Sequence, residues 1–239
     1  MMINFLDGVT AAILAGGLGT RLRSVVADRP KVLAPVAGRP YLTHLLDQLF
    51  TAGAGDVVLL TGYGADQVRA AFGDGYRGMT LRYSVEPEPL GTGGAVRHAL
   101  DLFAGDVLLM NGDSYCAIDL AGLVATARHT GQVGVALAHV DDVSRYGTVG
   151  IGPTGRVTAF AEKGGASGAG WINAGVYLIP RGCVADIPAG RAVSLEREVL
   201  PRWVADPGIR GVPGGRFIDI GTPESFAEAE AFFAPPADQ

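Results

Sequence analysis

The sequence predicts an α/β protein with a Rossmann-like, doubly wound and mostly parallel sheet, joined to a small antiparallel part. Between Val9 and about Val140, apolar runs rich in β-branched residues alternate with amphipathic segments, as in strands joined by crossover helices. After about Asp141, shorter strand-like pieces alternate with glycine-rich turns, which is typical of antiparallel pairing. The chain has 239 residues, 48% of them hydrophobic, enough for one large core.

In the parallel part, strands and helices are indicated by different spacings of apolar residues. Helices are predicted where such residues recur at helical spacing, at Tyr41, Leu42, Leu45, Leu46 and Leu49, and again at Val96, Leu100 and Phe103. Strands are predicted at the continuous apolar runs Val9–Leu14, Val57–Thr61, Leu81–Val85, Val107–Met110 and Val133–Val140.

The rest of the chain is predicted to form the antiparallel part and a closing unit. The strand-like pieces are Thr148–Ile151, Arg156–Ala161, Ile172–Ile179 and, near the end, Arg216–Ile220. Ser194 can cap a helix that runs to about Val204, and Pro223 can begin a helix that ends near Phe233. We expect one domain over residues 1–234, with divisions near 140 and 215, and a frayed tail at 235–239.

Composition and charge exclude several classes of protein. The net charge of −5 provides no basic field for nucleic acid or an anionic membrane. No apolar stretch is long enough for a membrane helix and the first residues do not resemble a signal peptide, so we expect a soluble, cytoplasmic protein. Cys116 and Cys183 lie far apart without metal-ligand spacing and are expected to be reduced packing residues. The four histidines do not cluster, and we expect them to be structural or on the surface.

A glycine-rich loop follows the first predicted strand directly. Its three glycines, Gly16, Gly17 and Gly19, let backbone amides approach phosphate oxygens, and Arg21 adds a forked donor. A simple strand-to-loop turn would also require glycine. Two better-known phosphate loops do not fit, because G-x-G-x-x-G would need glycine at Leu22 and no G-x-x-x-x-G-K-[ST] occurs. Lys31, after Pro30, can bring a second positive charge to the same phosphates.

Together these residues resemble the sugar nucleotidylyltransferase family. The segment Leu14–Leu22 followed by Pro30-Lys31 is similar to that family's G-G-x-G-T-R-L motif with its later P-K, and the resemblance extends to about Glu224. It implies the nucleotide-diphospho-sugar transferase fold, with a nucleotide-binding core to about residue 140 and a sugar-binding part at about 141–215. It also implies that the loop holds the triphosphate through Leu14, Ala15, Gly16, Gly17, Gly19, Thr20 and Arg21, and that Lys31 neutralises charge.

Two aspartates end predicted strands that lie far apart in the sequence. Asp113 follows Asn111-Gly112 after the strand Val107–Met110, and Asp219 lies near the end of the last strand. Taken singly, either one can be a turn or cap residue. A pair of carboxylates beside phosphate oxygens suits Mg²⁺, and the resemblance implies that these two aspartates are its ligands.

The resemblance places the sugar 1-phosphate at a second group of residues. Lys163 would grip its phosphate, Glu162 and Asn173 would bind sugar hydroxyls, and Gly147 would line the pocket. Glu162-Lys163 can also be an exposed ion pair. The family commonly has proline after this lysine, whereas here Gly164 opens a glycine-rich loop, so the family pattern does not fix that wall of the pocket.

The segment Ser84–Ala95 resembles the family's base-recognition segment and also includes Gly91 and Thr92 among the expected nucleotide contacts. Glu86 stands where thymidylyl and uridylyl members often have glutamine. An ionised carboxylate is acceptor-only and can pair with the two adjacent donors of guanine, which favours GTP. Which of Glu86 and Glu88 faces the base depends on the backbone path. The whole sequence is most similar to the D-glycero-α-D-manno-heptose 1-phosphate guanylyltransferase branch, which implies a heptose 1-phosphate as the acceptor.

Several alternatives stay open at this point. A uridylyl- or thymidylyltransferase acting on a hexose or N-acetylmuramic acid 1-phosphate would differ only in its base and sugar pockets. A non-catalytic nucleotide-sugar sensor on the same fold would be expected to lack some of Arg21, Lys31, Asp113 and Asp219, yet all are present. A transferase that consumes an activated sugar often has a D-x-D pair, whereas Tyr115 follows Asp113 here. Ala231-Phe232-Phe233 can pack on the core or on a second copy, so a homodimer also stays open.

Overall fold

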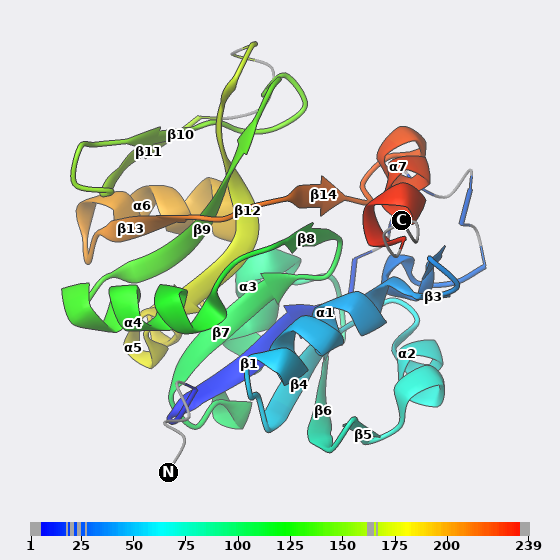
Figure 1. Cartoon of the computed structure of the whole chain (residues 1–239). Coiled ribbons are helices and arrows are strands. Elements are labelled where there is room, and N and C mark those ends of the chain that lie inside the picture. The colour runs from blue at the N-terminus through cyan, green and yellow to red at the C-terminus, as the bar shows by residue number, and fades with distance from the viewer. Residues whose placement is uncertain are drawn as a thin grey trace.

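The fold is built on one mixed sheet of eight strands. The computed structural model describes residues 6–17, 19, 22, 25, 26, 28–161, 165 and 167–234. The strand order is β13-β9-β12-β7-β1-β4-β6-β5 (Figure 1). In chain order these strands are β1 (Val9–Leu14), β4 (Asp56–Thr61), β5 (Gly75–Tyr76), β6 (Met79–Val85), β7 (Asp106–Asn111), β9 (Val133–Val140), β12 (Gly170–Ile179) and β13 (Ile209–Pro213).

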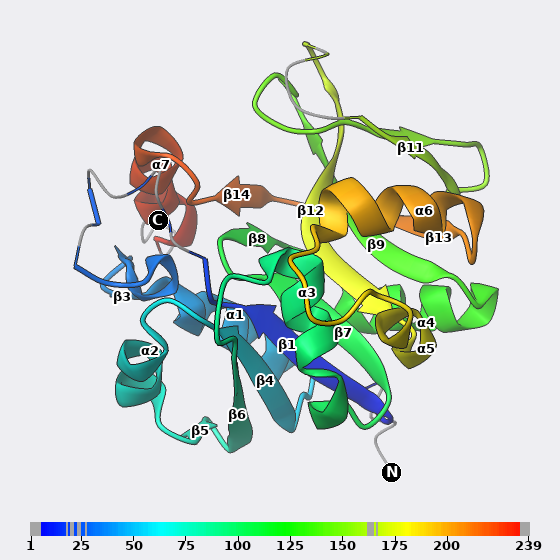
Figure 2. The ribbon, with the colours of Figure 1, turned by 180° about the vertical axis from the view of Figure 1, so that it is seen from behind.

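Helices cover both faces of this sheet. Successive side chains of β1 alternate between the faces, so Ala11 and Ile13 join one buried cluster while Ala12 joins the other. The first cluster contains residues of α1 (Tyr41–Thr51), α4 (Leu120–Thr130) and α7 (Pro223–Phe233). The second contains residues of α3 (Gly91–His98), α5 (Arg181–Ala185) and α6 (Leu200–Ala205), which lie in front when the molecule is seen from behind (Figure 2). The predicted doubly wound α/β class is therefore confirmed.

Parallel pairing dominates the half of the sheet that contains β1. Strand β1 pairs in parallel with β4 on one side and β7 on the other, and β4 pairs in parallel with β6. Helix α2 (Ala65–Phe72) lies between β4 and β6 in the chain. The chain first builds outward from β1 through β4 to β6 and then crosses back to β7, so the winding direction changes beside β1.

The antiparallel part is smaller than predicted. Strands β10 (Val149–Ile151) and β11 (Val157–Phe160) form a separate antiparallel pair. Strand β12, which we expected beside them, instead lies inside the main sheet and pairs antiparallel with both β7 and β9. Its apolar run fits either place, because the central strand of a covered sheet is buried on both faces. Strand β13 was not predicted, and it pairs in parallel with β9.

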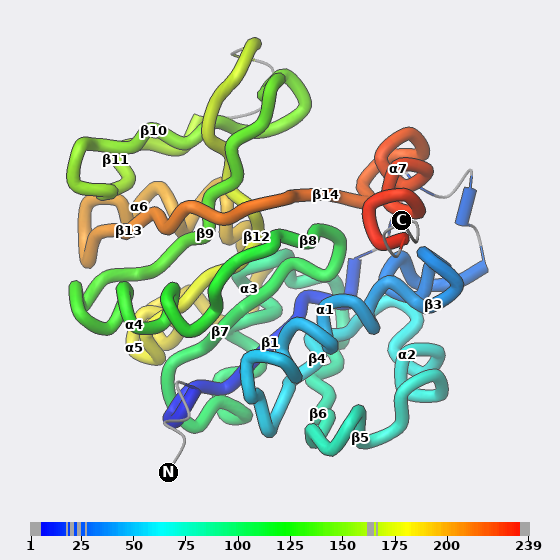
Figure 3. Tube along the Cα trace, in the orientation of Figure 1, coloured from blue at the N-terminus to red at the C-terminus, as the bar shows by residue number. Residues whose placement is uncertain are grey.

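The last part of the chain returns to the centre of the molecule. After β13, the trace runs across to β14 (Phe217–Asp219) and then into α7 (Figure 3). Strand β14 pairs with β8 (Ser114–Cys116), a short strand not predicted from the sequence. Phe232 and Phe233 of α7 make edge contacts with the ring of Tyr115 and thus pack on the core of their own chain. A last small sheet joins β2 (Pro35–Val36) and β3 (Arg39–Pro40).

Both cysteines are free thiols, as expected. Cys116 is buried, and burial raises its pKa to about 11, which disfavours the thiolate. Within the described part of the chain, no helix combines the length and the apolar character that crossing a bilayer demands.

Candidate active site

A cavity of about 740 Å³ opens where β1, β4 and β7 end. Leu14 at the end of β1 is in register with Leu60 of β4 and with Asn111 of β7, so the loops after these strands start side by side. Open α/β sheets bind ligands at this edge, at the point where the winding direction changes. The predicted residues that line the cavity are Leu14, Ala15, Gly16, Gly17, Gly19, Lys31, Glu86, Gly91, Thr92, Asn111, Gly112 and Asp113.

The loops after β1 and β7 approach so closely that they require glycine. A Cβ on Gly112 would lie 2.1 Å from the carbonyl oxygen of Leu14. On the other side, the Ala15 amide donates to the Leu60 carbonyl at 2.7 Å. These contacts fix the start of the glycine-rich loop between its two neighbours. Thr20 and Arg21, two predicted triphosphate contacts in this loop, lie outside the described residues.

Glu86 is wedged between the loops that follow β1 and β4. Its Oε1 lies 2.9 Å and 2.7 Å from the positions that a Cβ would take on Gly16 and Gly62, so only glycine leaves room for it. Its Oε2 accepts a hydrogen bond from the Leu90 amide at 2.9 Å. Burial raises the pKa of Glu86 above its ordinary value, while the Leu90 bond opposes that shift. Glu88 also lines the cavity but is exposed, so Glu86 is the more enclosed of the two candidates for the base.

Lys31 and Asp113 form an ion pair at the cavity wall. Lys31 begins a short 3₁₀ turn, Lys31–Leu33, and its Nζ lies 2.8 Å from Asp113 Oδ2. The Lys31 side chain is 12% exposed and that of Asp113 is 45% exposed, so the carboxylate stays open to a ligand. The Cβ of Lys31 would lie 3.4 Å from a Cβ on Gly19, which places the lysine beside the glycine-rich loop.

The pairing of β14 with β8 brings Asp219 to Asp113. Asp219 is in register with Ser114, the residue after Asp113, and the Ile220 amide donates to the Asp113 carbonyl at 2.8 Å. The Asp219 carboxylate is held from several sides. Its Oδ1 accepts from the Gly221 amide at 2.7 Å and from Ser225 Oγ at 3.2 Å. Asp219 itself does not line the cavity, although the adjacent Gly221 does.

The chemistry of this pair fits a divalent cation. Burial raises the pKa of the Tyr41 hydroxyl, and the negative charges of Asp113 and Asp219 raise it further. Both carboxylates therefore lie close enough to influence the same buried hydroxyl. That hydroxyl has no hydrogen-bond partner among the described residues. No cluster of three or more His, Cys, Asp or Glu suited to a metal exists in the described chain, so phosphate oxygens and water would complete the coordination.

Asn111 and Asn173 meet at Tyr177 on the other side of the cavity. Asn173 Nδ2 donates to the buried Tyr177 hydroxyl at 2.8 Å, and its Oδ1 accepts from the Gly175 amide at 3.0 Å. The register of β12 against β9 shifts between Asn173 and Tyr177, a local irregularity of the kind often found beside active sites. Asn111 Oδ1 is buried without a partner in the described chain. Asn173 does not line the cavity itself.

The remaining predicted sugar contacts lie beside β11. A Cβ on Gly147 would lie 2.6 Å from the carbonyl oxygen of Ala161, so the chain at Gly147 needs glycine for this approach. Gly147 does not line the cavity. Glu162 and Lys163, which follow Ala161 directly, lie outside the described residues, and their predicted roles stay predictions.

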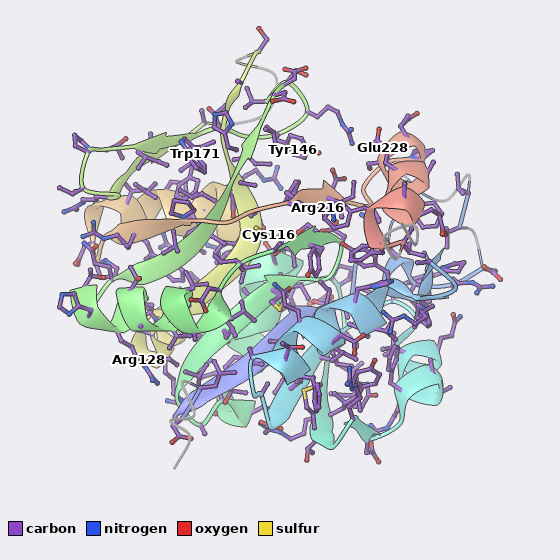
Figure 4. All side chains as sticks on the ribbon, in the orientation of Figure 1. Cys116, Arg128, Tyr146, Trp171, Arg216 and Glu228 are labelled. Atoms are coloured by element: carbon purple, nitrogen blue, oxygen red, sulfur yellow. The ribbon has the colours of Figure 1, made fainter. Side chains whose placement is uncertain are left out.

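Two residues that the sequence analysis did not single out belong to this region. Tyr146 donates from its hydroxyl to Asp219 Oδ2 at 2.6 Å, and its side chain lies above β14 (Figure 4). Glu196 lines the cavity from a segment more than 80 residues beyond Asp113. Neither carries a motif of its own. Tyr146 directly precedes Gly147, which the resemblance places in the sugar pocket, and this neighbourhood is the one sequence feature that indicates Tyr146.

The described lining is rich in negative charge. It contains the carboxylates Glu86, Glu88, Asp113 and Glu196, and among the described lining residues Lys31 is the one cation. A triphosphate in such a cavity requires further positive charge close to its oxygens. A divalent cation on the aspartate pair would meet that need, as would the predicted Arg21 and Lys163.

Residues 10–235 match the family described as Nucleotidyl transferase. The chain belongs to the nucleotidyl transferase family. This nucleotidyl transferase is 39% identical over 229 residues to the mannose-1-phosphate guanylyltransferase of Mycobacterium tuberculosis, covering 93% of this chain and 64% of that one. It is 37% identical over 225 residues to the D-glycero-alpha-D-manno-heptose 1-phosphate guanylyltransferase of Aneurinibacillus thermoaerophilus, covering 92% and 96%.

A solved structure shares the fold over nearly its whole length. The crystal structure of HddC from Yersinia pseudotuberculosis complexed with GMP-PN superposes with a TM-score of 0.83 at 33% identity, covering 94% of this nucleotidyl transferase and 99% of that chain. The predicted enzyme class, sugar-1-phosphate nucleotidylyltransferase, is thereby confirmed. Enzymes of this family generally use a divalent metal ion.

Proposed function

We propose that this enzyme transfers GMP from GTP to D-glycero-α-D-manno-heptose 1-phosphate with Mg²⁺, releasing pyrophosphate. The observation that carries the choice of base is the enclosed Glu86 carboxylate, because its oxygens can accept from the two adjacent N–H donors of guanine. The Leu90 amide already holds Oε2, which fixes the orientation of the carboxylate and leaves Oε1 without a described partner. The heptose guanylyltransferase that spans nearly the same length, and the GMP-PN complex of HddC, support both substrates.

The reaction needs charge neutralisation rather than a general base. A phosphate oxygen of the sugar 1-phosphate, whose second pKa is about 6, forms the new bond to the α-phosphorus of GTP. The bond from that phosphorus to the bridging oxygen breaks, and pyrophosphate leaves with the electron pair. Lys31 has three N–H donors and can keep its contact with Asp113 while it donates to the triphosphate. We assign Arg21 to the triphosphate and Lys163 to the sugar phosphate.

Asp113 and Asp219 would hold the Mg²⁺ ion, since paired strands bring their backbones together and their oxygens are hard ligands. The ion would neutralise phosphate charge as pyrophosphate departs. The residues themselves would do the positioning: the glycine-rich loop would receive the phosphates, and Asn111 lines the cavity beside it.

D-Mannose 1-phosphate is the second candidate acceptor, because the mycobacterial mannose-1-phosphate guanylyltransferase is 39% identical to this chain. The chain spans 64% of that relative's length. The uridylyl- and thymidylyltransferase alternatives are weaker, since their bases present one donor and one acceptor where Glu86 offers acceptors only.

The test combines a substrate panel with a matched pair of variants. Purified protein with Mg²⁺ and inorganic pyrophosphatase is given GTP, UTP, dTTP, ATP or CTP against heptose, mannose, glucose and N-acetylmuramic acid 1-phosphates, and phosphate release is measured. We expect selective turnover of GTP with the heptose. Glu86→Gln should lower kcat/KM for GTP by roughly 10- to 100-fold, because a charged hydrogen bond is lost, whereas Glu88→Gln should change it little.

Each other result has a definite meaning. Preference for mannose would keep the chemistry and replace the sugar. Turnover with UTP or dTTP would overturn the role of Glu86 as a guanine acceptor, and a larger effect at Glu88 than at Glu86 would move that role to Glu88. Nucleotide binding without turnover of any pair would favour the sensor.

A further inference from the structure

Glu196 brings a carboxylate into the cavity from the C-terminal third of the chain. It lies in a π-helical turn, Leu195–Val199, that Ser194 caps and that leads directly into α6. Interruptions of this kind are rare and occur preferentially at functional sites. Glu196 is half-buried and lines the same cavity as Asn111 and Asp113.

One oxygen of this carboxylate is fully engaged by the protein. Oε2 accepts from Thr92 Oγ1 at 2.7 Å and from Ser194 Oγ at 3.1 Å. The Leu195 amide donates in turn to Thr92 Oγ1 at 2.8 Å. This short network ties the π-helical turn to the start of α3 and fixes the direction of the side chain.

The other oxygen is left for a ligand. Oε1 accepts no hydrogen bond from any described residue, and Glu196 forms no ion pair in the described chain. A neutral glutamine would accept the same two hydroxyl hydrogen bonds through its carbonyl oxygen, so the network does not require a charge. Oε1 is therefore the acceptor that a donor group of a ligand can use.

The position of Glu196 favours the sugar over the base and over the phosphates. Burial, and then the negative charge of Glu196, raise the pKa of Tyr177, whose hydroxyl Asn173 contacts. Glu196 and Asn111 line the same cavity, and although Thr92 of the base segment holds one oxygen of Glu196, that segment already supplies Glu86 for the base. A carboxylate repels phosphate and only accepts hydrogen bonds, so its partner must be an N–H or O–H donor, and a sugar supplies such donors as hydroxyls.

We propose that Glu196 is a specificity-determining residue that accepts a hydrogen bond from a hydroxyl of the sugar 1-phosphate and so selects uncharged, polyhydroxylated sugars. The same charge rejects sugars that carry a carboxylate near that position. This inference rests on the proposed function, since it needs a sugar 1-phosphate in the cavity. It adds a substrate contact from the turn before α6, outside every segment that the motifs predict.

The test compares Glu196→Gln with Glu198→Gln, using KM and kcat for both substrates. Glu198 is the matched control, because it lies in the same turn, pairs with Arg191 at 3.0 Å and does not line the cavity. Glu196→Gln should raise KM for the sugar 1-phosphate by roughly 10- to 100-fold and leave KM for GTP within about twofold. Glu198→Gln should leave both constants near wild type.

Deoxy sugars distinguish a direct contact from a structural effect. With the wild-type enzyme, one member of a series of deoxyheptose 1-phosphates should lose the same factor that Glu196→Gln loses, and the variant should lose nothing further with that analogue. A glucuronic acid 1-phosphate should be discriminated against less by the variant than by wild type.

Equal rises in KM for sugar and GTP, or losses that simply add across every deoxy sugar, would overturn the proposal and leave Glu196 a structural partner of Thr92. An unchanged KM for the sugar would overturn it as well. Wild-type turnover separates the two hypotheses: if wild type turns over no pair, the proposed function fails, whereas normal wild-type turnover with an unaffected variant sinks only the role of Glu196.

Discussion

The hydroxyl of Tyr146 contacts Asp219, one of the two residues that we propose to hold the metal ion. It donates to Asp219 Oδ2 at 2.6 Å, while Arg145 Nη2 lies 3.6 Å from the same oxygen. Burial, followed by its bond to Asp219, raises the pKa of Tyr146 well above its ordinary value, so the hydroxyl stays a donor. Groups that hold a metal ligand in this way orient it and adjust its affinity for the ion.

The Tyr146→Phe substitution should therefore lower the affinity of the site for the metal ion without destabilising the fold. We expect the Mg²⁺ concentration for half-maximal activity to rise by roughly 10- to 100-fold, and Mn²⁺ binding in the absence of sugar, measured by electron paramagnetic resonance, to weaken in parallel. Tyr76→Phe is the control, because it removes a comparable hydrogen bond, to Asp47 at 2.9 Å, outside the cavity lining. If the Mg²⁺ concentration for half-maximal activity stays unchanged, either Gly221 and Ser225 suffice to orient Asp219 or Asp219 does not bind the metal ion.

The site residues that belong to sequence motifs could be predicted. Site residues that reach the cavity only through the packing of distant segments could not. Lys31, Asp113 and the glycines follow apolar strands in recognisable motifs, and the structure brings the described ones together at one cavity. Glu196 follows a capping serine and looks like part of an ordinary helix start. Its approach to Thr92 depends on how the turn Leu195–Val199 packs against α3, which no local pattern encodes.

At the scale of elements, the irregular stretch of β12 positions the Asn111 side of the cavity. Gly175 has a φ of +76°, and a Cβ there would lie 2.7 Å from Ser114 Oγ and 2.8 Å from Asn111 Nδ2. The backbone of β12 can reach β7 and β8 at this point only because glycine has no side chain.

Gly175→Ala should distort this contact and destabilise the protein. Crowding against Asn111 adds about 1 to 3 kcal/mol to the cost of the backbone conformation and should also raise KM for the substrates. Gly131→Ala is the matched control, since its φ of +64° is similar but nothing lies within 4 Å of the added Cβ. Urea denaturation of both variants measures the difference, and equal losses of unfolding free energy would refute a packing effect.

The elements themselves were predictable to different degrees. Long apolar runs such as Val9–Leu14 and Val133–Val140 were predicted with the bounds that the structure has. The short β8 has too few residues for a periodic signal, and β13 contains Gly211 and Pro213, which weaken a strand pattern. The antiparallel direction of β12 was expected, but its place inside the main sheet was not, because its apolar run fits either a covered central strand or a separate antiparallel part.

At the scale of the whole molecule, His44 ties α1 to the C-terminal helix. It is buried at 6% exposure, its Nε2 lies 3.0 Å from the Val36 carbonyl oxygen, and its ring stacks on Phe233 at 3.9 Å. Arg39 Nη2 lies 3.2 Å from Nδ1. If Nε2 donates to the carbonyl, Nδ1 is the acceptor for Arg39, and the ring is neutral.

This arrangement makes global stability depend on pH. Burial lowers the pKa of His44 below its ordinary value, so as pH falls the unfolded chain takes up the proton first. The stability that His44 contributes is complete above the unfolded pKa of about 6.5 and is lost as pH falls from there toward the folded pKa. The loss of unfolding free energy between about pH 8 and about pH 5 should thus be smaller in His44→Gln than in wild type. The exposed His129→Gln should behave like wild type, and an identical loss in all three proteins would rule out this role.

The pairing of β14 with β8 also has a consequence for how the enzyme is made. Asp113 leaves the ribosome early, with the glycine-rich loop and Lys31 already synthesised, whereas Asp219 follows roughly 5 to 20 s later at ordinary elongation rates. A nascent chain can therefore contain the glycine-rich loop, Lys31 and Asp113 before Asp219 has been synthesised. A metal site between both aspartates, as proposed above, can therefore form only after β14 has been translated and has paired with β8.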